Sequence, residues 1–146
     1  MTRAIIYIRK PPILSRADLI SSDINLERQK NELVSHVAWF QLEVCDTLIE
    51  SDFSPDVLEQ RLALQVALQR MKELEARSLL VNRLDDLTTH AFEFDLLLKL
   101  YFENGFTLYA GWERFNSTTP EGRELLGLSR DQAKKVPHTL ERLDIS

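Results

Sequence analysis

Short runs of apolar residues alternate along this chain with longer segments in which apolar residues recur at helical spacing. The short runs, rich in β-branched and aromatic residues, cover residues 3–8, 41–48, 78–82 and 106–110. Such runs predict buried strands, and the segments between them predict helices. Because strands and helices alternate, we expect right-handed crossovers and a mostly parallel sheet of four or five strands. The pattern therefore predicts an α/β fold.

The first predicted helix begins near Asn25, whose side chain suits a helix N-cap. Its apolar face consists of Leu26, Leu33, Val37 and Phe40. Residues 9–24, which precede this helix, are then expected to form a long irregular loop. Loops of that length are often functional, so this segment is a candidate region of interest.

Two further helices are predicted between the later strands. One begins at residues 54–56, where a serine, a proline and an acid follow in the order typical of a helix start, and it extends to about Arg77. Its apolar stripe comprises Leu58, Leu62, Leu68, Met71 and Leu74. The other runs from about Asp85 to Asn104 and ends before Gly105, a residue type favoured just after a helix. Its centre, residues 92–102, is apolar nearly all round, which indicates burial or an interface.

The length and composition of the chain fit one domain. With 146 residues, the chain suffices for a single core, which we place in residues 1–128, followed by a polar tail or short helix at 129–146. The lone Cys45 excludes an internal disulfide and fits a reducing cytoplasm. No apolar run approaches the ~20 residues of a membrane span. We therefore expect a soluble cytoplasmic protein without a membrane partner.

Several kinds of chemistry lack their sequence signatures. All four glycines lie in the last third of the chain, so no glycine-rich phosphate-binding turn follows the first strand. The three histidines are scattered, and one cysteine does not make a structural zinc site. No nucleophile elbow is present. We expect neither a cofactor nor a metal.

Four segments, taken in order, resemble the catalytic domain of the serine recombinases, the resolvase/invertase family. They are Tyr7-Ile8-Arg9 at the end of the first strand, residues 25–29 (NLERQ), residues 81–88 (VNRLDDLT) and residues 116–123 (NSTTPEGR). The last two are the most specific, and the spacing between segments also agrees. The resemblance covers roughly residues 3–128 and implies a three-layer, flavodoxin-like domain.

The resemblance also implies an activity. Members of this family cut DNA by attack of a serine hydroxyl on a backbone phosphate, form a phosphoserine link, and rejoin the strands without a metal. A phosphoryl transition state without a metal requires fixed guanidinium charge, which arginines supply.

This sequence departs from the family pattern where the chemistry should be. The serine position, two residues after the arginine that ends the first strand, holds Pro11. Two arginine positions in the third segment hold Asp86 and Thr89, although Asp85 keeps the family aspartate. Loss of one transition-state arginine alone costs about 10³-fold or more in phosphoryl transfer. Because nucleophile and cations are lost together, we infer that strand cleavage is gone.

Other positions of the family site are retained. Tyr7 and Arg9 match at the first strand, and Arg61 resembles the arginine that begins the family's second helix. Arg9 and Arg61 are candidates for residual phosphate binding, but pairing with Asp85 and Asp86 is the commoner role for such arginines. Tyr7 is expected to be a half-buried strand residue. Adjacent acids at a helix start are usually favoured by the helix dipole rather than by a metal.

DNA binding is expected to be weak or lost. The net charge is −5, the basic residues of the tail are offset by acids, and the tail is too short for a helix-turn-helix. A partner protein, either a second copy or a different chain, is the alternative. Candidate contact residues are Phe92, Leu96 and Leu100 together with Leu125, Leu126 and Leu128, although core packing is the commoner explanation for such residues.

Three functions remain open from the sequence. The favoured one is a non-catalytic regulatory or binding protein derived from a site-specific recombinase. The second is a recombinase that uses a displaced serine, for which Ser15, Ser21 and Ser22 are candidates, or that acts beside an intact partner chain. The third is a module in which Arg9, Lys10 and Arg61 hold an anionic effector.

Overall fold

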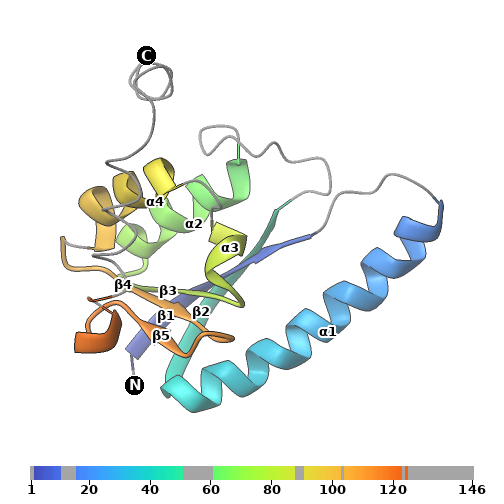
Figure 1. The fold of residues 1–146 in the computed structure, drawn as a ribbon, viewed down its shortest axis with the longest axis horizontal. Coiled ribbons are helices and arrows are strands. Elements are labelled where there is room, and N and C mark those ends of the chain that lie inside the picture. The colour runs from blue at the N-terminus through green and yellow to red at the C-terminus, as the bar shows by residue number, and fades with distance from the viewer. Residues whose placement is uncertain are drawn as a thin grey trace.

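A computed structural model describes residues 2–10, 16–50, 61–87, 91–102, 104–122 and 124, with only the backbone described at 17–23 and 91. The strands are β1 (Thr2–Arg9), β2 (Leu42–Glu50), β3 (Ser78–Val81), β4 (Thr107–Ala110) and β5 (Phe115–Asn116). The helices are α1 (Arg16–Phe40), α2 (Leu62–Glu73), α3 (Leu84–Leu87) and α4 (Ala91–Leu97), which continues into a π-helical turn, η2 (Leu98–Phe102). Figure 1 shows their arrangement.

The five strands form one sheet in the order β2-β1-β3-β4-β5. The first four are parallel, and β5 is antiparallel to β4. Tyr7 of β1 lies between Leu48 of β2 and Val81 of β3. The predicted α/β fold and mostly parallel sheet are confirmed. The short β5 was missed, because two residues carry no periodicity that a sequence pattern can reveal.

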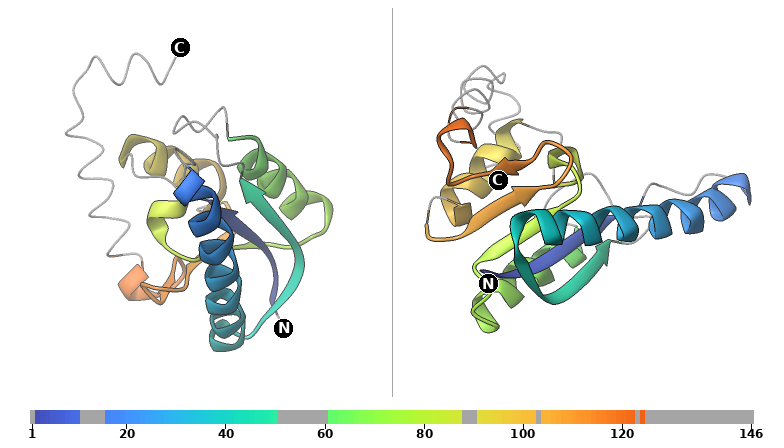
Figure 2. Two further views of the ribbon diagram at one scale, coloured as in Figure 1. Left: turned by 90° about the vertical axis from the view of Figure 1, so that its right-hand side faces the viewer. Right: turned by 90° about the horizontal axis from the view of Figure 1, so that it is seen from below.

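Helices cover both faces of the sheet, which makes three layers (Figures 1 and 2). Alternate residues of β1 therefore enter different cores. Ile5 and Tyr7 join the larger cluster, with residues of α2, α4 and η2. Ile6 and Ile8 join the smaller cluster, against α1. Burial on both faces explains why β1 reads as a continuous apolar run rather than as an alternating one.

The first helix is longer than predicted. α1 begins at Arg16 rather than near Asn25, so the expected loop at residues 9–24 is wrong for residues 16–24. Serine and aspartate at positions 21–23 favour caps and turns only as a local preference, which the helix overrides. The predicted apolar face is confirmed, since Leu26, Leu33, Val37 and Phe40 all pack in the smaller cluster.

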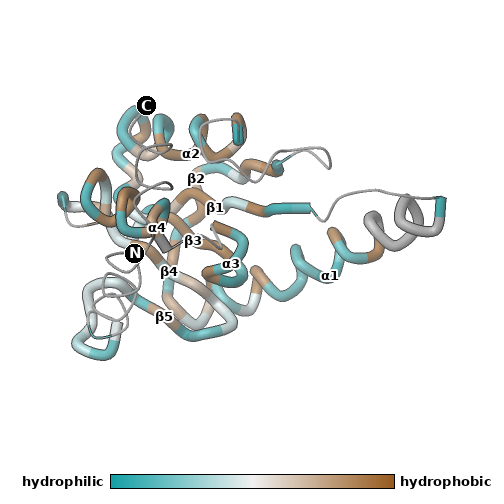
Figure 3. The backbone as a smooth tube through the Cα atoms, turned by 45° about the horizontal axis from the view of Figure 1, so that its top comes forward, coloured by the Kyte–Doolittle hydropathy of each residue, from teal (hydrophilic) through white to brown (hydrophobic). Residues whose placement is uncertain are grey.

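The hydropathy of α1 differs from that of the strands. Figure 3 shows a mostly hydrophilic α1 beside hydrophobic central strands. Within the described parts of the chain, no helix combines the length and the apolarity that crossing a bilayer requires.

The second predicted helix is confirmed in its later part and corrected in its buried face. Its expected start at residues 54–56 and Leu58 lie outside the described residues. Leu68 and Met71 are buried as predicted, and Leu74 packs against the core. Leu62 is 69% exposed, however, and Leu64 takes the core position instead. The helix ends at Glu73, before Glu75 adopts a left-handed backbone with φ 54°.

The third predicted helix is divided into α3, α4 and η2. Gly105 follows with φ 95°, the left-handed conformation expected after a helix. Phe94, Leu97, Leu98 and Phe102 are buried, but Leu96 and Leu100 are 38% and 56% exposed. Core packing was therefore the wrong expectation for Leu96 and Leu100, whereas Phe92 is half-buried.

Two leucines of α2 provide a matched test of this packing. Leu64→Ala is expected to lower the free energy of unfolding by about 2–5 kcal/mol, because the fully buried side chain leaves a cavity. Leu62→Ala, on the exposed face of the same helix, should change it by less than about 0.5 kcal/mol. Urea denaturation followed by circular dichroism measures both. Equal losses from the two variants would contradict the assigned helix face.

Candidate functional site

The candidate site lies at the carboxyl ends of β1 and β3, the two central strands. From β1 the chain crosses to β2 on one side, while β3 pairs with β1 on the other. Such a switch point in an open parallel sheet is where ligands usually bind. Arg9 ends β1 and Lys10 follows it, while Asn82 and Arg83 follow β3 directly. The site residues predicted from β1 and β3 therefore do meet at one edge.

Arg61 is the centre of this edge, and it is fully buried. Its Nε and Nη2 atoms donate to the Tyr7 hydroxyl over 3.2 and 2.7 Å. Nη2 also donates to the carbonyl of Asp86, and Nη1 donates to the carbonyl of Leu87. The predicted partners were the carboxylates of the two aspartates. The guanidinium instead binds a hydroxyl and two backbone oxygens, so it is an internal tie between β1, α2 and α3.

Glu50, the last residue of β2, completes this buried network. Its Oε1 accepts a hydrogen bond of 2.8 Å from the Tyr7 hydroxyl. The same carboxylate accepts the backbone N–H groups of Ala63 at 3.0 Å and Leu64 at 3.2 Å. These N–H groups belong to the first turn of α2, where Arg61 supplies no side-chain cap. Glu50 therefore takes the role of an N-cap from a distant strand.

Tyr7 connects the arginine to the glutamate. It is fully buried rather than half-buried as predicted, because both faces of β1 are covered. Burial raises the pKa of its hydroxyl above the ordinary value, although Arg61 opposes the shift. Tyr7 therefore stays protonated, accepts from Arg61 and donates to Glu50.

The two aspartates have different surroundings. Asp85 is exposed, whereas Asp86 is half-buried and its Oδ2 accepts the Arg83 backbone N–H at 3.2 Å. An acid that reaches back to the residue before the helix in this way stabilises the start of α3. Burial raises the pKa of Asp86, and the charges of Arg83 and Arg9 partly offset this shift. Arg9 thus lies close to a carboxylate, as expected from the sequence.

A second polar network borders the site on the α1 side. Asn82 donates to Glu32 at 2.8 Å, and its Oδ1 lies 2.9 Å from His36 Nε2. Trp112 Nε1 donates to the same Glu32 oxygen at 3.1 Å. Burial would raise the pKa of Glu32, but the hydrogen bonds from Asn82 and Trp112 hold it below its usual range. A Cβ atom at Gly111 would lie 2.1 Å from the His36 ring, so glycine permits this close approach.

Gln29 is a site residue whose role the sequence did not reveal. It belongs to the second family-like segment, and it is 9% exposed. Its Nε2 donates to Asn25 Oδ1 at 3.1 Å and to the Arg9 carbonyl at 3.5 Å. Its Oε1 is buried without a hydrogen-bond partner among the described residues. Glu50 was likewise missed, because an acid at the end of an apolar strand is expected to be exposed to solvent, whereas Glu50 is buried.

The fourth family-like segment forms a structural turn. Ser117 Oγ accepts the Leu108 N–H at 2.9 Å, which ties the turn to β4. Thr119 Oγ1 accepts the Gly122 N–H at 3.0 Å. A Cβ atom at Gly122 would lie 1.9 Å from the Asn116 carbonyl oxygen, which explains the need for glycine. This segment therefore supports the sheet.

Several positions predicted from the sequence fall in parts of the chain that the structure does not describe. Pro11, Thr89 and Ser15 lie outside the described residues, as do Leu125, Leu126 and Leu128. Ser21 and Ser22 lie within α1, where only the backbone is described. Among the described residues, no three histidine, cysteine, aspartate or glutamate side chains are placed to share a metal ion. In the described part of this edge, the cationic side chains are Arg9, Lys10 and Arg83. The carboxyl group of Asp86 lies near Arg9 and Arg83.

Comparisons with known proteins agree with this fold. Residues 4–134 match the family model for the resolvase N-terminal domain. The structure is similar to the N-terminal catalytic domain of TP901-1 integrase, with TM-score 0.71 and 23% identity over 91% of this chain and 95% of that one. It is similar to a resolvase family site-specific recombinase from Streptococcus pneumoniae, with TM-score 0.72 and 14% identity over 99% and 91%. The C-terminal catalytic domain of ISC1926 TnpA, an IS607-like serine recombinase, gives TM-score 0.56 and 20% identity over 84% and 74%. None of the curated protein sequences matches significantly.

The Tyr7 hydroxyl provides the first test of the buried network. Tyr7→Phe is expected to lower the free energy of unfolding by about 1–3 kcal/mol, because donors of Arg61 and an oxygen of Glu50 lose their partner. Tyr109→Phe is the control, since that buried ring makes no hydroxyl hydrogen bond within the described residues. Chemical denaturation measures both variants. An unchanged stability for Tyr7→Phe would mean that the network contributes nothing.

Asp86 gives a pH-dependent test. Its pKa is raised in the folded protein, so the folded state holds the proton more tightly and ionisation opposes folding. Asp86→Asn removes that opposition and should raise Tm at neutral pH. The difference should shrink as the pH falls toward the pKa of unfolded aspartate, about 3.9. Thermal melts across pH measure it, with the exposed Asp85→Asn as control. A lower Tm for Asp86→Asn at neutral pH would contradict the assigned shift.

Proposed function

This chain belongs to the resolvase family, and from that premise we propose that it is a member retained for binding, without strand cleavage of its own. Its role is that of a regulatory or binding protein in a system of site-specific recombination. It acts through contacts with another protein chain, either a second copy or a different partner, and its direct hold on DNA is weak.

The missing nucleophile is the first support. Cleavage by the family's chemistry begins with a hydroxyl oxygen placed two residues after the arginine that ends the first strand. Here that position is Pro11, and a pyrrolidine ring cannot attack a phosphate. The hydroxyl of Tyr7 does not replace it, because that group is buried and committed to Arg61 and Glu50.

The charge at the edge is the second support. Positions that carry arginine in the family hold Asp86 and Thr89. A carboxylate about 4 Å from a phosphate oxygen is repelled by roughly 4 kcal/mol at an effective dielectric constant of 20. Asp86 also has a structural role at the start of α3. Asp86 therefore supports the helix start through its hydrogen bond, while its negative charge disfavours a bound phosphate.

The state of Arg61 carries the proposal. Four of its N–H···O contacts go to Tyr7 and to the carbonyls of Asp86 and Leu87, and none of its surface is exposed. A transition-state phosphate needs guanidinium donors aimed at it. The retained arginine that resembles a family site residue is instead used to hold the fold together. Residual anion contact would fall to Arg9, beside Asp86.

A covalent-adduct assay tests the loss of cleavage. Purified protein is incubated with nicked duplexes that carry the chromosomal sequences flanking its gene, quenched with detergent and analysed on denaturing gels. We expect no protein–DNA adduct from the native chain or from Pro11→Ser, since Asp86 and Thr89 still replace cations. An active serine recombinase on its own site is the positive control. A phosphoserine-linked adduct from the native chain, identified by mass spectrometry, would refute the proposal.

A further inference from the structure

Both tryptophans of this chain lie at its surface. Trp39, near the end of α1, is 59% exposed, and Trp112, in the turn between β4 and β5, is 56% exposed. Tryptophan is on average one of the more buried residue types, so two exposed indole rings need an explanation. Tryptophan and arginine are the residue types that contribute most to protein–protein contacts.

An arginine is stacked on each indole ring. The Cζ atom of Arg114 lies 3.8 Å from the centre of the Trp39 ring, and that of Arg83 lies 4.9 Å from the centre of the Trp112 ring. Both arginines are exposed, and among the described residues neither guanidinium donates a hydrogen bond. A stacked guanidinium keeps its in-plane N–H groups open to a planar anion. Each pair therefore presents donors for a carboxylate beside an apolar ring.

The two pairs belong to one surface. Glu32 and Trp39 lie seven residues apart on α1, about two turns, and therefore on the same side of the helix. The Trp112 indole donates to Glu32, and two residues later Arg114 stacks on Trp39. The turn between β4 and β5 thus follows α1 along this side. We define the arginine–tryptophan surface as Trp39, Arg83, Trp112 and Arg114.

Backbone contacts hold the turn in one conformation. The N–H group of Arg114 donates to the Gly111 carbonyl at 3.2 Å, and the N–H group of Trp112 donates to the Asn82 carbonyl at 2.9 Å. Arg114 has a left-handed backbone with φ 50°, which is uncommon for a residue with a side chain. A surface that is already ordered loses less conformational entropy when it binds a partner.

The acids of this surface already accept hydrogen bonds from the protein. The Glu32 carboxylate accepts from the side chains of Asn82 and Trp112. The Glu113 carboxylate accepts the Leu84 backbone N–H at 3.1 Å. The groups left open to a partner are therefore the guanidinium donors.

We propose that the arginine–tryptophan surface binds an acidic segment of a partner protein. Carboxylates of that segment accept hydrogen bonds from Arg83 and Arg114, and its aliphatic side chains cover the exposed parts of Trp39 and Trp112. This inference rests on the proposed role in protein binding and names the surface and the chemistry of that partner.

A peptide fits this surface better than a nucleic acid does. Glu32 and Glu113 add negative charge beside the arginines, and the whole chain has a net charge of −5. A nucleic acid carries a phosphate at every nucleotide, so some of its phosphates would meet these acids. A peptide can place carboxylates opposite the arginines alone.

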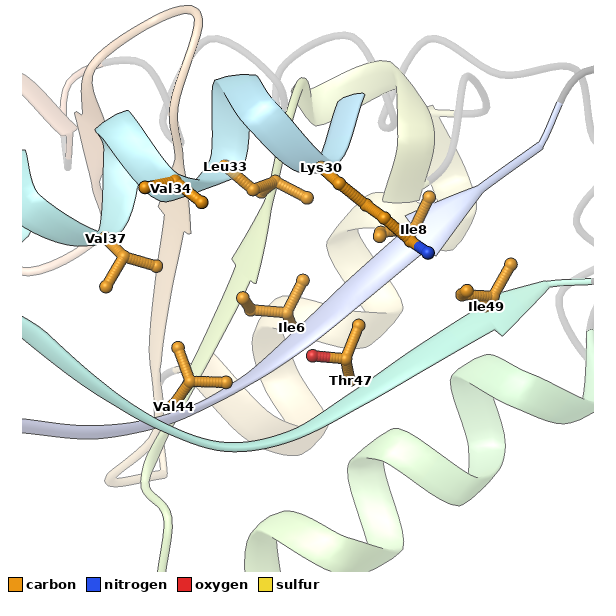
Figure 4. Close-up of a pocket in the computed structure, with 9 residues that line it drawn as sticks. All are labelled: Ile6, Ile8, Lys30, Leu33, Val34, Val37, Val44, Thr47 and Ile49. Carbon is orange, nitrogen blue, oxygen red and sulfur yellow. The ribbon is translucent and has the colours of Figure 1, made fainter. Parts of the chain in front are cut away.

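The apolar groove on the opposite side of α1 lacks such chemistry. Figure 4 shows this groove, a cavity of about 470 Å³ between α1, β1 and β2. Its lining is aliphatic apart from Thr47 and Lys30. Because Lys30 and Glu32 are two residues apart, they lie about 200° apart around the helix. Lys30 is therefore a matched control for the loss of one positive charge away from the arginine–tryptophan surface.

Intrinsic fluorescence tests the proposal, because Trp39 and Trp112 are the only tryptophans of the chain. The probes are peptides of about twelve residues that combine glutamate with leucine and proline, each with a counterpart that carries glutamine instead of glutamate. At least one glutamate peptide should change the emission saturably, and its counterpart should bind about tenfold more weakly or worse. The proposal is overturned by no saturable change with any glutamate peptide, by equal binding of the counterparts, or by tighter binding of an oligothymidine of similar length.

Charge variants locate the binding surface. Arg83→Ala and Arg114→Ala should each raise the Kd of the glutamate peptide by about tenfold, whereas Lys30→Ala should change it by less than about twofold. Arg114→Lys keeps the charge without the planar fork and should also weaken binding. Circular dichroism shows that each variant is folded. Equal weakening by Lys30→Ala and Arg114→Ala would indicate a diffuse charge effect and would refute the assigned surface. The covalent-adduct assay uses neither peptides nor these variants, so a failed surface and a failed loss of cleavage give different results.

Discussion

The hydrogen bonds of the buried Arg61 guanidinium hold four elements of this fold in place. They link Tyr7 in β1 to the start of α2 and to the backbone of α3, and Tyr7 passes the connection to Glu50 at the end of β2. A buried cation without partners costs several kcal/mol, so loss of any of these acceptors should destabilise the domain.

The same network keeps the shape of this edge without a bound ligand, which is what the proposed loss of cleavage requires. The guanidinium of Arg61 is satisfied by protein atoms, and Asp86 stabilises the start of α3. No ligand is required to accept the hydrogen bonds of the Arg61 guanidinium, because the Tyr7 hydroxyl and two backbone carbonyls accept them.

Sequence patterns predicted those features that depend on local or periodic signals. The parallel strands, the apolar face of α1 and the left-handed Gly105 followed from burial periodicity and backbone preference. The errors arose where tertiary contacts decide. Asn25 was the predicted cap but lies inside α1, and Leu62 continued a stripe that Leu64 in fact occupies. The partners of Arg61 could not be predicted either, because the Tyr7 hydroxyl and two backbone carbonyls leave no local signal at position 61. The family resemblance predicted Tyr7, Arg9 and Arg61 as site residues, and the structure joins Arg61 to Tyr7 by hydrogen bonds.

The carboxylate of Glu50 also affects the chain that connects β2 to α2. Because Glu50 accepts the N–H groups of Ala63 and Leu64, both ends of the connection at residues 51–60 are held within hydrogen-bonding distance of one side chain. The anchoring contacts therefore belong to the end of β2 and to the first turn of α2, so the Glu50 carboxylate fixes the position of this helix relative to the strand before it.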